Sequence, residues 1–270
     1  MTGVLVVIPA RYASSRYPGK PLVRLRGAQG VALTLIERTW RAAKAVASAD
    51  RVVVATDDDR IRDTALGFGA EVVMTSPEAR NGTERVAEAA VTLGSEARIV
   101  VNLQGDAPLT PPWFVDALVS ALDRDAGADA ATPVLRCSAG ALASLRADRA
   151  AGRVGGTTAV FDSAGRALYF SKEVIPFTAA QAGAGGEGAA TPVFHHVGVY
   201  AYRPEALAAY PGWDAGPLER NEGLEQLRFL ERGRAMLCVE VEARGRSFWE
   251  LNNPEDVPRL EAMLAEMSME

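Results

Sequence analysis

Lysine, histidine and cysteine are scarce in this chain of 270 residues. Lysine stands only at Lys20, Lys44 and Lys172, so arginine supplies the other 26 of the 29 basic residues. The two cysteines, Cys137 and Cys238, lack the spacing of metal ligands and are expected to be buried thiols. The formal net charge of −5 also argues against nonspecific nucleic-acid binding, which needs a basic surface. Any recognition of phosphate is therefore expected in a local site.

Long hydrophobic runs are also missing. No segment approaches the roughly 18 apolar residues that a membrane span needs. No basic segment precedes the apolar run Val4–Ile8, as it would in a signal peptide. We therefore expect no membrane partner and a cytoplasmic location. With 48% hydrophobic and 23% charged residues, the chain can bury a sizeable core, and a single domain over residues 1–270 is expected.

Short apolar segments alternate with helical patterns through the first half of the chain. The predicted strands are Val4–Ile8, Val52–Ala55, Glu71–Met74 and Arg98–Leu103. The predicted helices are Leu33–Ala47, Asp58–Phe68, Thr83–Leu93 and Pro111–Leu122. This alternation predicts an α/β fold with a doubly wound, mostly parallel sheet. Because ligands bind at the carboxyl ends of such strands, the loops after the first, second and fourth strands are expected to carry chemistry.

The pattern changes after about residue 150 and predicts a smaller inserted α+β region. The predicted strands there are Thr157–Phe161, Ala167–Phe170, Phe194–Tyr202 and Ala235–Val241. Predicted helices cover Leu218–Leu230 and Pro254–Met263, the second with Asn253 as its N-cap. The segment 179–190 is rich in glycine and alanine and is expected to be a mobile surface loop.

The loop after the first strand carries the strongest chemical signal. It places Arg11, Arg16 and Lys20 at the carboxyl end of a buried strand. It contains neither the phosphate-binding Gly-x-x-x-x-Gly-Lys-Ser/Thr pattern nor the dinucleotide Gly-x-Gly-x-x-Gly pattern. Two guanidinium groups and an ammonium can hold a triphosphate and neutralise the charge that develops on leaving pyrophosphate. The alternative is a solvated basic loop.

Asp106 lies in a Gln-Gly-Asp turn directly after the fourth predicted strand. Magnesium in nucleotide sites is commonly held by one or two carboxylates, phosphate oxygens and water, so Asp106 is a predicted magnesium ligand. The alternative is a turn aspartate that bonds its own backbone. Asp57 and Asp58 precede a predicted helix, where N-capping is favoured. On its position alone, His196 is expected to be a packed, hydrogen-bonded strand residue.

Taken in order, several segments resemble the CMP-sugar synthetases, in particular the 3-deoxy-manno-octulosonate (Kdo) cytidylyltransferase family. The segments are Ile8–Leu22, Val54–Asp58, Gly82–Arg85, Asn102–Asp106, Ala167–Ser171 with Ile175-Pro176, His196–Arg203, Leu224–Arg228 and Pro254–Asp256. The resemblance implies a nucleotide-diphospho-sugar transferase fold of Rossmann type. It also implies transfer of CMP from CTP to an acidic sugar, with magnesium as cofactor and a homodimer as the assembly.

The same resemblance implies roles for individual residues. Residues 1–135 would mainly bind CTP, and residues 150–240 would mainly bind the acceptor and dimerise. Arg16, Lys20 and Asp106 would be catalytic. The nucleotide-binding set would be Pro9, Ala10, Arg11, Arg16, Lys20, Asn81, Gly82, Thr83, Gln104 and Asp106. The acceptor-binding set would be His196, Tyr200, Glu222 and Gln226, and the magnesium positions would be Asp106 and Asn252.

Three positions depart from the family pattern. Asn252 replaces the first Asp of Asp-Thr-Pro-Glu-Asp, Ala107 replaces the Glu of Gln-Gly-Asp-Glu-Pro, and Thr157–Val160 replaces Val-Lys-Val-Val. Because like charges a few ångströms apart cost roughly 1 to 4 kcal/mol, the loss of two carboxylates favours a more anionic acceptor.

We therefore interpret the chain as a cytidylyltransferase of phosphonate biosynthesis, with phosphonoformate as an example of its acceptor. The alternative is a CMP-Kdo synthetase acting on Kdo or a related sugar acid. A non-catalytic CTP-binding protein is a third hypothesis, disfavoured because the three loop cations and Asp106 are all present.

Overall fold

The computed structural model describes residues 3–13, 17–154, 156–178, 190–246, 249–251 and 253–269. The chain forms two compact units. The first unit comprises Met1–Val119, Ala201–Pro211 and Ala243–Glu270, and the second comprises Ser120–Tyr200 and Gly212–Glu242. Neither unit is therefore a single continuous stretch of sequence.

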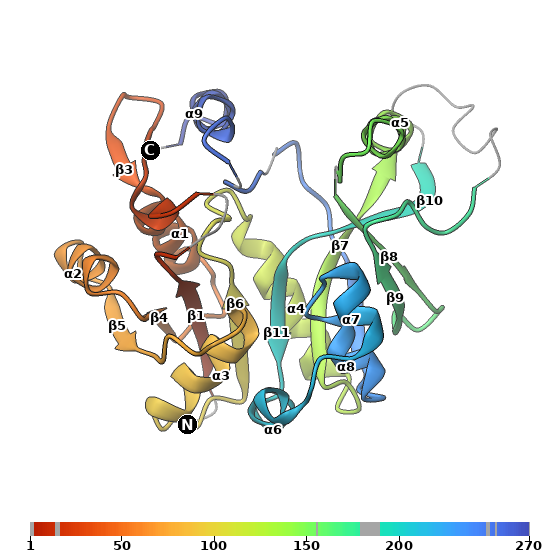
Figure 1. Cartoon of the computed structure of the whole chain (residues 1–270), viewed down its shortest axis with the longest axis horizontal. Coiled ribbons are helices and arrows are strands. Elements are labelled where there is room, and N and C mark those ends of the chain that lie inside the picture. The colour runs from red at the N-terminus through yellow and green to blue at the C-terminus, as the bar shows by residue number, and fades with distance from the viewer. Residues whose placement is uncertain are drawn as a thin grey trace. The chain divides into compact units, whose positions relative to one another are not determined.

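Four parallel strands form the sheet of the first unit, in the order β5–β4–β1–β6 (Figure 1). These strands are β1 (Val4–Ala10), β4 (Arg51–Thr56), β5 (Glu71–Met74) and β6 (Ile99–Leu103). The helices that alternate with them are α1 (Leu35–Lys44), α2 (Asp59–Gly67) and α3 (Gly82–Thr92). Every residue of β1 and β6 is buried, as the continuous apolar runs of parallel strands predict. The predicted α/β class is confirmed.

Side-chain caps set the start of all three helices. Thr34 accepts a hydrogen bond from the Glu37 amide, Asp58 from the Arg60 amide and Asn81 from the Glu84 amide. The predicted N-cap role of Asp58 is thus confirmed. Helix α1 begins at residue 35 rather than 33 because β3 (Ala32–Thr34) pairs with β2 (Arg24–Arg26) in a hairpin.

Helices α6 (Pro204–Ala209) and α9 (Asp256–Glu266) complete the first unit. The prediction for the last helix was wrong at its start, because its N-cap is Glu255 and not Asn253. The Asp256 carboxylate accepts hydrogen bonds from the Asn253 amide, at 2.7 Å, and from Trp249 Nε1, at 2.9 Å. These bonds hold residues 253–255 in a turn that precedes the helix.

Antiparallel pairing dominates the second unit, with strands in the order β7–β10–β8–β9 (Figure 1). Strand β12 pairs with β7 in parallel. The strands are β7 (Ala130–Ser138), β8 (Thr157–Phe161), β9 (Ala167–Ser171), β10 (Ala190–His196) and β12 (Met236–Glu240). The helices are α5 (Ala139–Ala150), α7 (Pro217–Glu222) and α8 (Leu227–Glu231). Strand β7 and helix α5 were not predicted from the sequence.

Two elements of this half were predicted as continuous and are interrupted. The predicted strand Phe194–Tyr202 divides into β10 and β11 (Val199–Tyr202), because the Val199 amide bonds the Val197 carbonyl in a tight turn. The predicted helix Leu218–Leu230 divides at Gly223, whose left-handed backbone (φ 63°) ends α7.

Helix α4 (Pro112–Arg124) and strand β11 each contribute residues to both units. Within the described ranges, none of the helices is long and apolar enough to cross a membrane. The predicted mobile loop at 179–190 lies outside the described residues except for Ala190.

Candidate functional site

The loop after β1 folds back on itself. The Gly19 amide donates a hydrogen bond to the Tyr12 carbonyl at 2.9 Å. Gly19 has a left-handed backbone (φ 72°), and a Cβ atom there would lie 3.0 Å from the Tyr12 ring, so only glycine fits well. Lys20 follows and begins a short 3₁₀ helix, Lys20–Leu22. Arg11 is exposed at the end of β1, whereas Arg16 lies outside the described residues.

Lys20 and Asp106 meet at the carboxyl edge of the first unit's sheet. Lys20 Nζ lies 2.6 Å from Asp106 Oδ2, although the two residues are 86 positions apart. The two side chains are 14% and 26% exposed, so both keep access to solvent. The structure therefore brings together the predicted triphosphate cation and the predicted magnesium ligand.

Gly105 explains how the turn after β6 reaches the end of β1. A Cβ atom at Gly105 would lie 2.7 Å from the Pro9 carbonyl oxygen, so any larger residue would push the turn away. The next residue of the same turn, Asp106, accepts a hydrogen bond at its backbone carbonyl from the Leu251 amide, at 3.0 Å. Asn252, the second predicted magnesium position, is outside the part of the chain that the structure describes.

The start of α3 lies against the same turn. A Cβ atom at Gly82 would lie 3.0 Å from the Gln104 amide, so two predicted nucleotide-binding residues are adjacent. The side chain of Asn81 caps the helix and also donates to Tyr210 Oη at 3.1 Å. The Thr83 hydroxyl is buried and lies 3.0 Å from Tyr202 Oη. The side chains of Asn81 and Thr83 are thus engaged within the protein.

Asn102 was part of a recognised segment but received no predicted role. It is fully buried in β6, and neither polar atom of its side chain has a hydrogen-bond partner among the described residues. Its Nδ2 lies 3.5 Å from the position of a Cβ on Gly82. Buried side-chain amides are normally bonded, so this unbonded amide beside Gly82 is unusual. The signal in the sequence is a polar residue within an otherwise apolar strand.

Three of the four predicted acceptor residues gather in the second unit. His196 Nε2 lies 2.9 Å from Thr132 Oγ1, and the His196 ring packs against Phe170 and Tyr200. Tyr200 Oη donates to Gln226 Oε1 at 3.2 Å. The Gln226 amide nitrogen is buried and has no partner among the described residues. This cluster can donate and accept hydrogen bonds without carrying a charge.

Burial keeps both histidines neutral. Desolvation lowers the pKa of His195 to about 4. It lowers the pKa of His196 to about 3, with His195 as a second, electrostatic cause. Near neutral pH, the His196 ring is therefore uncharged and can form only neutral hydrogen bonds. Burial also raises the pKa of the two cysteine thiols, to about 12 for Cys238, and both cysteines are free as predicted.

Glu222, the fourth predicted acceptor residue, is engaged by the protein itself. Its carboxylate accepts hydrogen bonds from Ser171 Oγ at 2.6 Å, the Lys172 amide at 2.9 Å and Tyr169 Oη at 3.4 Å. Desolvation and this carboxylate raise the pKa of Tyr169. Lys172 Nζ lies close to Gly223, the residue after Glu222, since a Cβ atom added to Gly223 would be 3.0 Å from it. Lys172 thus adds a cation to this region. It received no predicted role, and only the scarcity of lysine in the chain drew attention to it.

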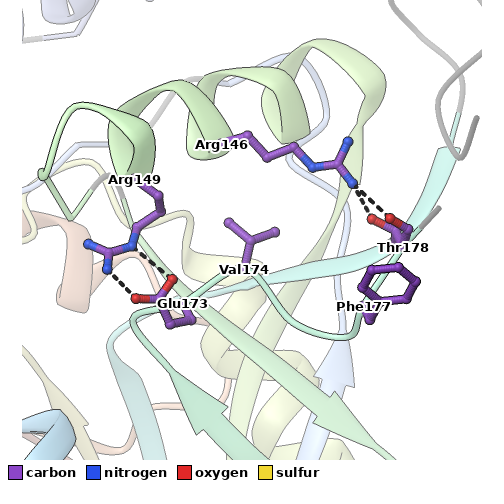
Figure 2. A pocket seen from close by; sticks show the side chains of 6 residues that line it. All are labelled: Arg146, Arg149, Glu173, Val174, Phe177 and Thr178. Carbon is purple, nitrogen blue, oxygen red and sulfur yellow. Dashed lines mark hydrogen bonds and ion pairs between the residues drawn. The ribbon is translucent and has the colours of Figure 1, made fainter. Parts of the chain in front are cut away.

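A hollow of about 610 Å³ lies on the second unit, beside α5. Figure 2 shows that Arg146 and Arg149 reach into it from one helix and that each already has a partner. Arg149 pairs with Glu173, and Arg146 bonds Thr178. Glu173 neutralises Arg149, whereas the partner of Arg146 among the described residues is the uncharged Thr178.

Comparisons with known proteins identify the family of the chain. A cytidylyltransferase family model matches residues 5–237. The 3-deoxy-manno-octulosonate cytidylyltransferase of Maricaulis maris (strain MCS10) is 47% identical over 262 residues, which cover 97% of each chain. The chain belongs to the 3-deoxy-manno-octulosonate cytidylyltransferase family. The mitochondrial enzyme of that name from Arabidopsis thaliana is 37% identical over 98% of this chain and 84% of its own.

The fold of this cytidylyltransferase also matches a solved relative. A CMP:2-keto-3-deoxy-manno-octonic acid synthetase complexed with CTP has a TM-score of 0.81 and 32% identity. The match covers 98% of this chain and 99% of that one. The predicted family, fold class and enzyme class are confirmed, and the protein is a nucleotidyltransferase. The roles of single residues stay predictions.

Proposed function

We propose that this cytidylyltransferase transfers CMP from CTP to 3-deoxy-manno-octulosonate or a closely related sugar acid and releases pyrophosphate. The observation that carries the proposal is the 47% identity, over 97% of both chains, with an enzyme named for that acceptor. The relatives therefore favour a sugar acid, the alternative acceptor, over phosphonoformate. None of the relatives named above supports phosphonoformate.

The first unit supplies what cytidylyl transfer requires. An acceptor oxygen attacks the α-phosphorus of CTP while the bond to pyrophosphate breaks. Asp106 holds the Lys20 ammonium in place through an ion pair of 2.6 Å. Arg11, in the same loop as Lys20, is exposed to solvent. Positioning and charge neutralisation by such groups supply most of the catalysis in phosphate chemistry.

The chemistry of Asp106 fits a magnesium ion. Its carboxylate is a hard oxygen donor beside the predicted triphosphate site, and it is 26% exposed. Within the described ranges, no group of three or more acidic, histidine or cysteine side chains could hold a metal. Asp106 would therefore share the ion with phosphate oxygens and water. Bound magnesium would neutralise charge on the phosphates.

The second unit suits a hydroxyl-rich acceptor whose only charge is one carboxylate. His196, Tyr200 and Gln226 form an uncharged hydrogen-bonding cluster, and Lys172 is a cation near Glu222. A sugar acid has hydroxyl groups for the first set and a single negative charge for the lysine. A trianionic phosphonate would meet mostly uncharged groups.

The decisive experiment offers purified protein CTP, magnesium and a panel of acceptors and identifies products by mass spectrometry. A product with the mass of CMP joined to the sugar acid, with equimolar pyrophosphate, is expected. A CMP-phosphonate product alone would contradict the acceptor, and absence of pyrophosphate with every acceptor would favour a CTP-binding protein. Replacing CTP by UTP should lower the rate, because uracil has a carbonyl where cytosine has an amine. A buried polar group left without its hydrogen-bond partner costs about 1–3 kcal/mol.

Asn252 gives a prediction about magnesium. The family pattern has Asp at this position, so Asn252→Asp should lower the magnesium concentration needed for half-maximal activity and raise turnover with the sugar acid. The measurement is a magnesium titration with Asn253→Asp as the neighbouring control. An unchanged magnesium requirement would show that position 252 does not affect the ion.

The homodimer implied by the resemblance stays a prediction. Sedimentation at several protein concentrations tests it, and a mass of one chain at all concentrations would contradict it.

A further inference from the structure

Thr132 contacts the ring of His196 from the neighbouring strand. Thr132 is fully buried on β7. His196 on β10 is paired with Val134, so Thr132, two residues from Val134, has its side chain on the same face of the sheet. Thr132 Oγ1 lies 2.9 Å from His196 Nε2, 2.8 Å from the Val199 carbonyl oxygen and 3.2 Å from the Val197 carbonyl oxygen.

These distances decide which nitrogen of His196 carries the proton. A threonine hydroxyl has one proton, and a carbonyl oxygen can only accept. If that proton pointed at Nε2, Oγ1 would face the Val199 oxygen at 2.8 Å with no proton between them. The hydroxyl therefore donates to the carbonyl, and Nε2–H donates to Oγ1. Nδ1 is left with its lone pair, and no hydrogen bond from a described residue reaches it.

We propose that Thr132 is a positioning residue that holds His196 in the Nε2–H tautomer, so that Nδ1 accepts a hydrogen bond from a hydroxyl of the acceptor. The inference rests on the proposed function, in which His196 contacts a sugar acid. A sugar hydroxyl can donate to Nδ1, whereas the oxygens of an ionised phosphonate can only accept and would be repelled. Thr132 and His196 together thus select a polyhydroxylated acceptor.

Nitrogen NMR of ¹⁵N-histidine-labelled protein tests the tautomer directly, since the chain has only two histidines. A His195→Gln variant assigns the His196 signals. The wild type and Thr132→Ser should show an unprotonated Nδ1 and a protonated Nε2 near neutral pH. Thr132→Val, which keeps the shape but lacks the hydroxyl, should shift the ring toward the other tautomer. A protonated Nδ1 in the wild type would overturn the proposal whether or not Thr132→Val folds.

Kinetics separate positioning from a structural role. Thr132→Val should raise the KM for the sugar acid at least tenfold and change the KM for CTP less than twofold, and Thr132→Ser should restore both. A parallel rise in both constants, or no change in either, would overturn the proposal. Failure of the wild type to use any sugar acid would instead overturn the proposed function, and the nitrogen spectrum would still decide the tautomer.

Discussion

Residues at the carboxyl edge of the first unit's sheet meet a steric and an electrostatic requirement. Gly19 and Gly105 allow close backbone approaches, and Lys20 and Asp106 then meet at 2.6 Å. The glycines act sterically and the charged pair acts electrostatically. Substitutions at the two kinds of position should therefore differ in effect, with glycine changes lowering stability and charge changes lowering turnover.

Lys20→Ala tests the electrostatic part. Turnover should fall about 100-fold or more, because one preorganised charge donor is commonly worth about 3 kcal/mol in the transition state. The melting temperature should change little, since Asp106 keeps access to solvent. Lys44→Ala, at an exposed position in the last turn of α1, is the matched control and should leave turnover unchanged. A near-normal rate for Lys20→Ala would exclude the triphosphate role.

Whole elements begin and end where local chemistry requires, and α3 shows this most clearly. Asn81 caps its first turn, and Glu84 accepts a hydrogen bond from the Arg80 amide at 2.8 Å. Helix α2 has a similar start at Asp58. The cap at Asp58 was predicted from the sequence, because such residues favour the position before a helix, whereas Asn81 was predicted only as a nucleotide-binding residue. The breaks after Val197 and at Gly223 were missed, because each depends on one turn inside an apparently regular pattern.

The two caps give a matched pair of variants. Asn81→Ala and Asp58→Ala should each lower the free energy of unfolding by about 1 kcal/mol, since each leaves one helical amide without its acceptor. Only Asn81→Ala should also weaken CTP binding, because only α3 begins beside Gln104. Urea unfolding and calorimetric titration with CTP measure the two effects. Equal CTP affinity in both variants would remove the start of α3 from the nucleotide site.

At the scale of the whole molecule, the buried histidines couple stability to pH. The pKa values of His195 and His196 are lowered to about 4 and about 3 in the folded chain. In the unfolded chain they lie near 6.5, so below that pH the unfolded state binds protons that the folded state does not. Stability should therefore fall as the pH drops from about 6.5 toward 4, in a range where most carboxylates are still ionised.

The loss should be on the order of 2 kcal/mol for each ring at pH 5 relative to pH 7.5. Urea unfolding at half-unit pH steps measures it. His195→Gln should remove about half of the pH dependence between pH 7 and 5, because one of the two rings no longer titrates. A flat profile over that range would show that neither histidine is held neutral by burial.

The sequence by itself determined the four parallel strands of the first unit, the helices α1, α2 and α3 between them, and the place of Lys20 in the loop after β1. These features depend on local causes: buried parallel strands need continuous apolar runs, and helices need caps. The family also followed from the sequence, because its motifs are short and ordered along the chain.

Only the tertiary structure decided which side chains meet. Lys20 and Asp106 are 86 residues apart, Thr132 and His196 are 64 apart, and Ser171 and Glu222 are 51 apart. Contacts of this kind depend on strand order and register, which local patterns do not encode. For the same reason the tautomer of His196 could not be predicted, since it depends on the Thr132 hydroxyl, which lies against the ring and bonds the Val199 carbonyl.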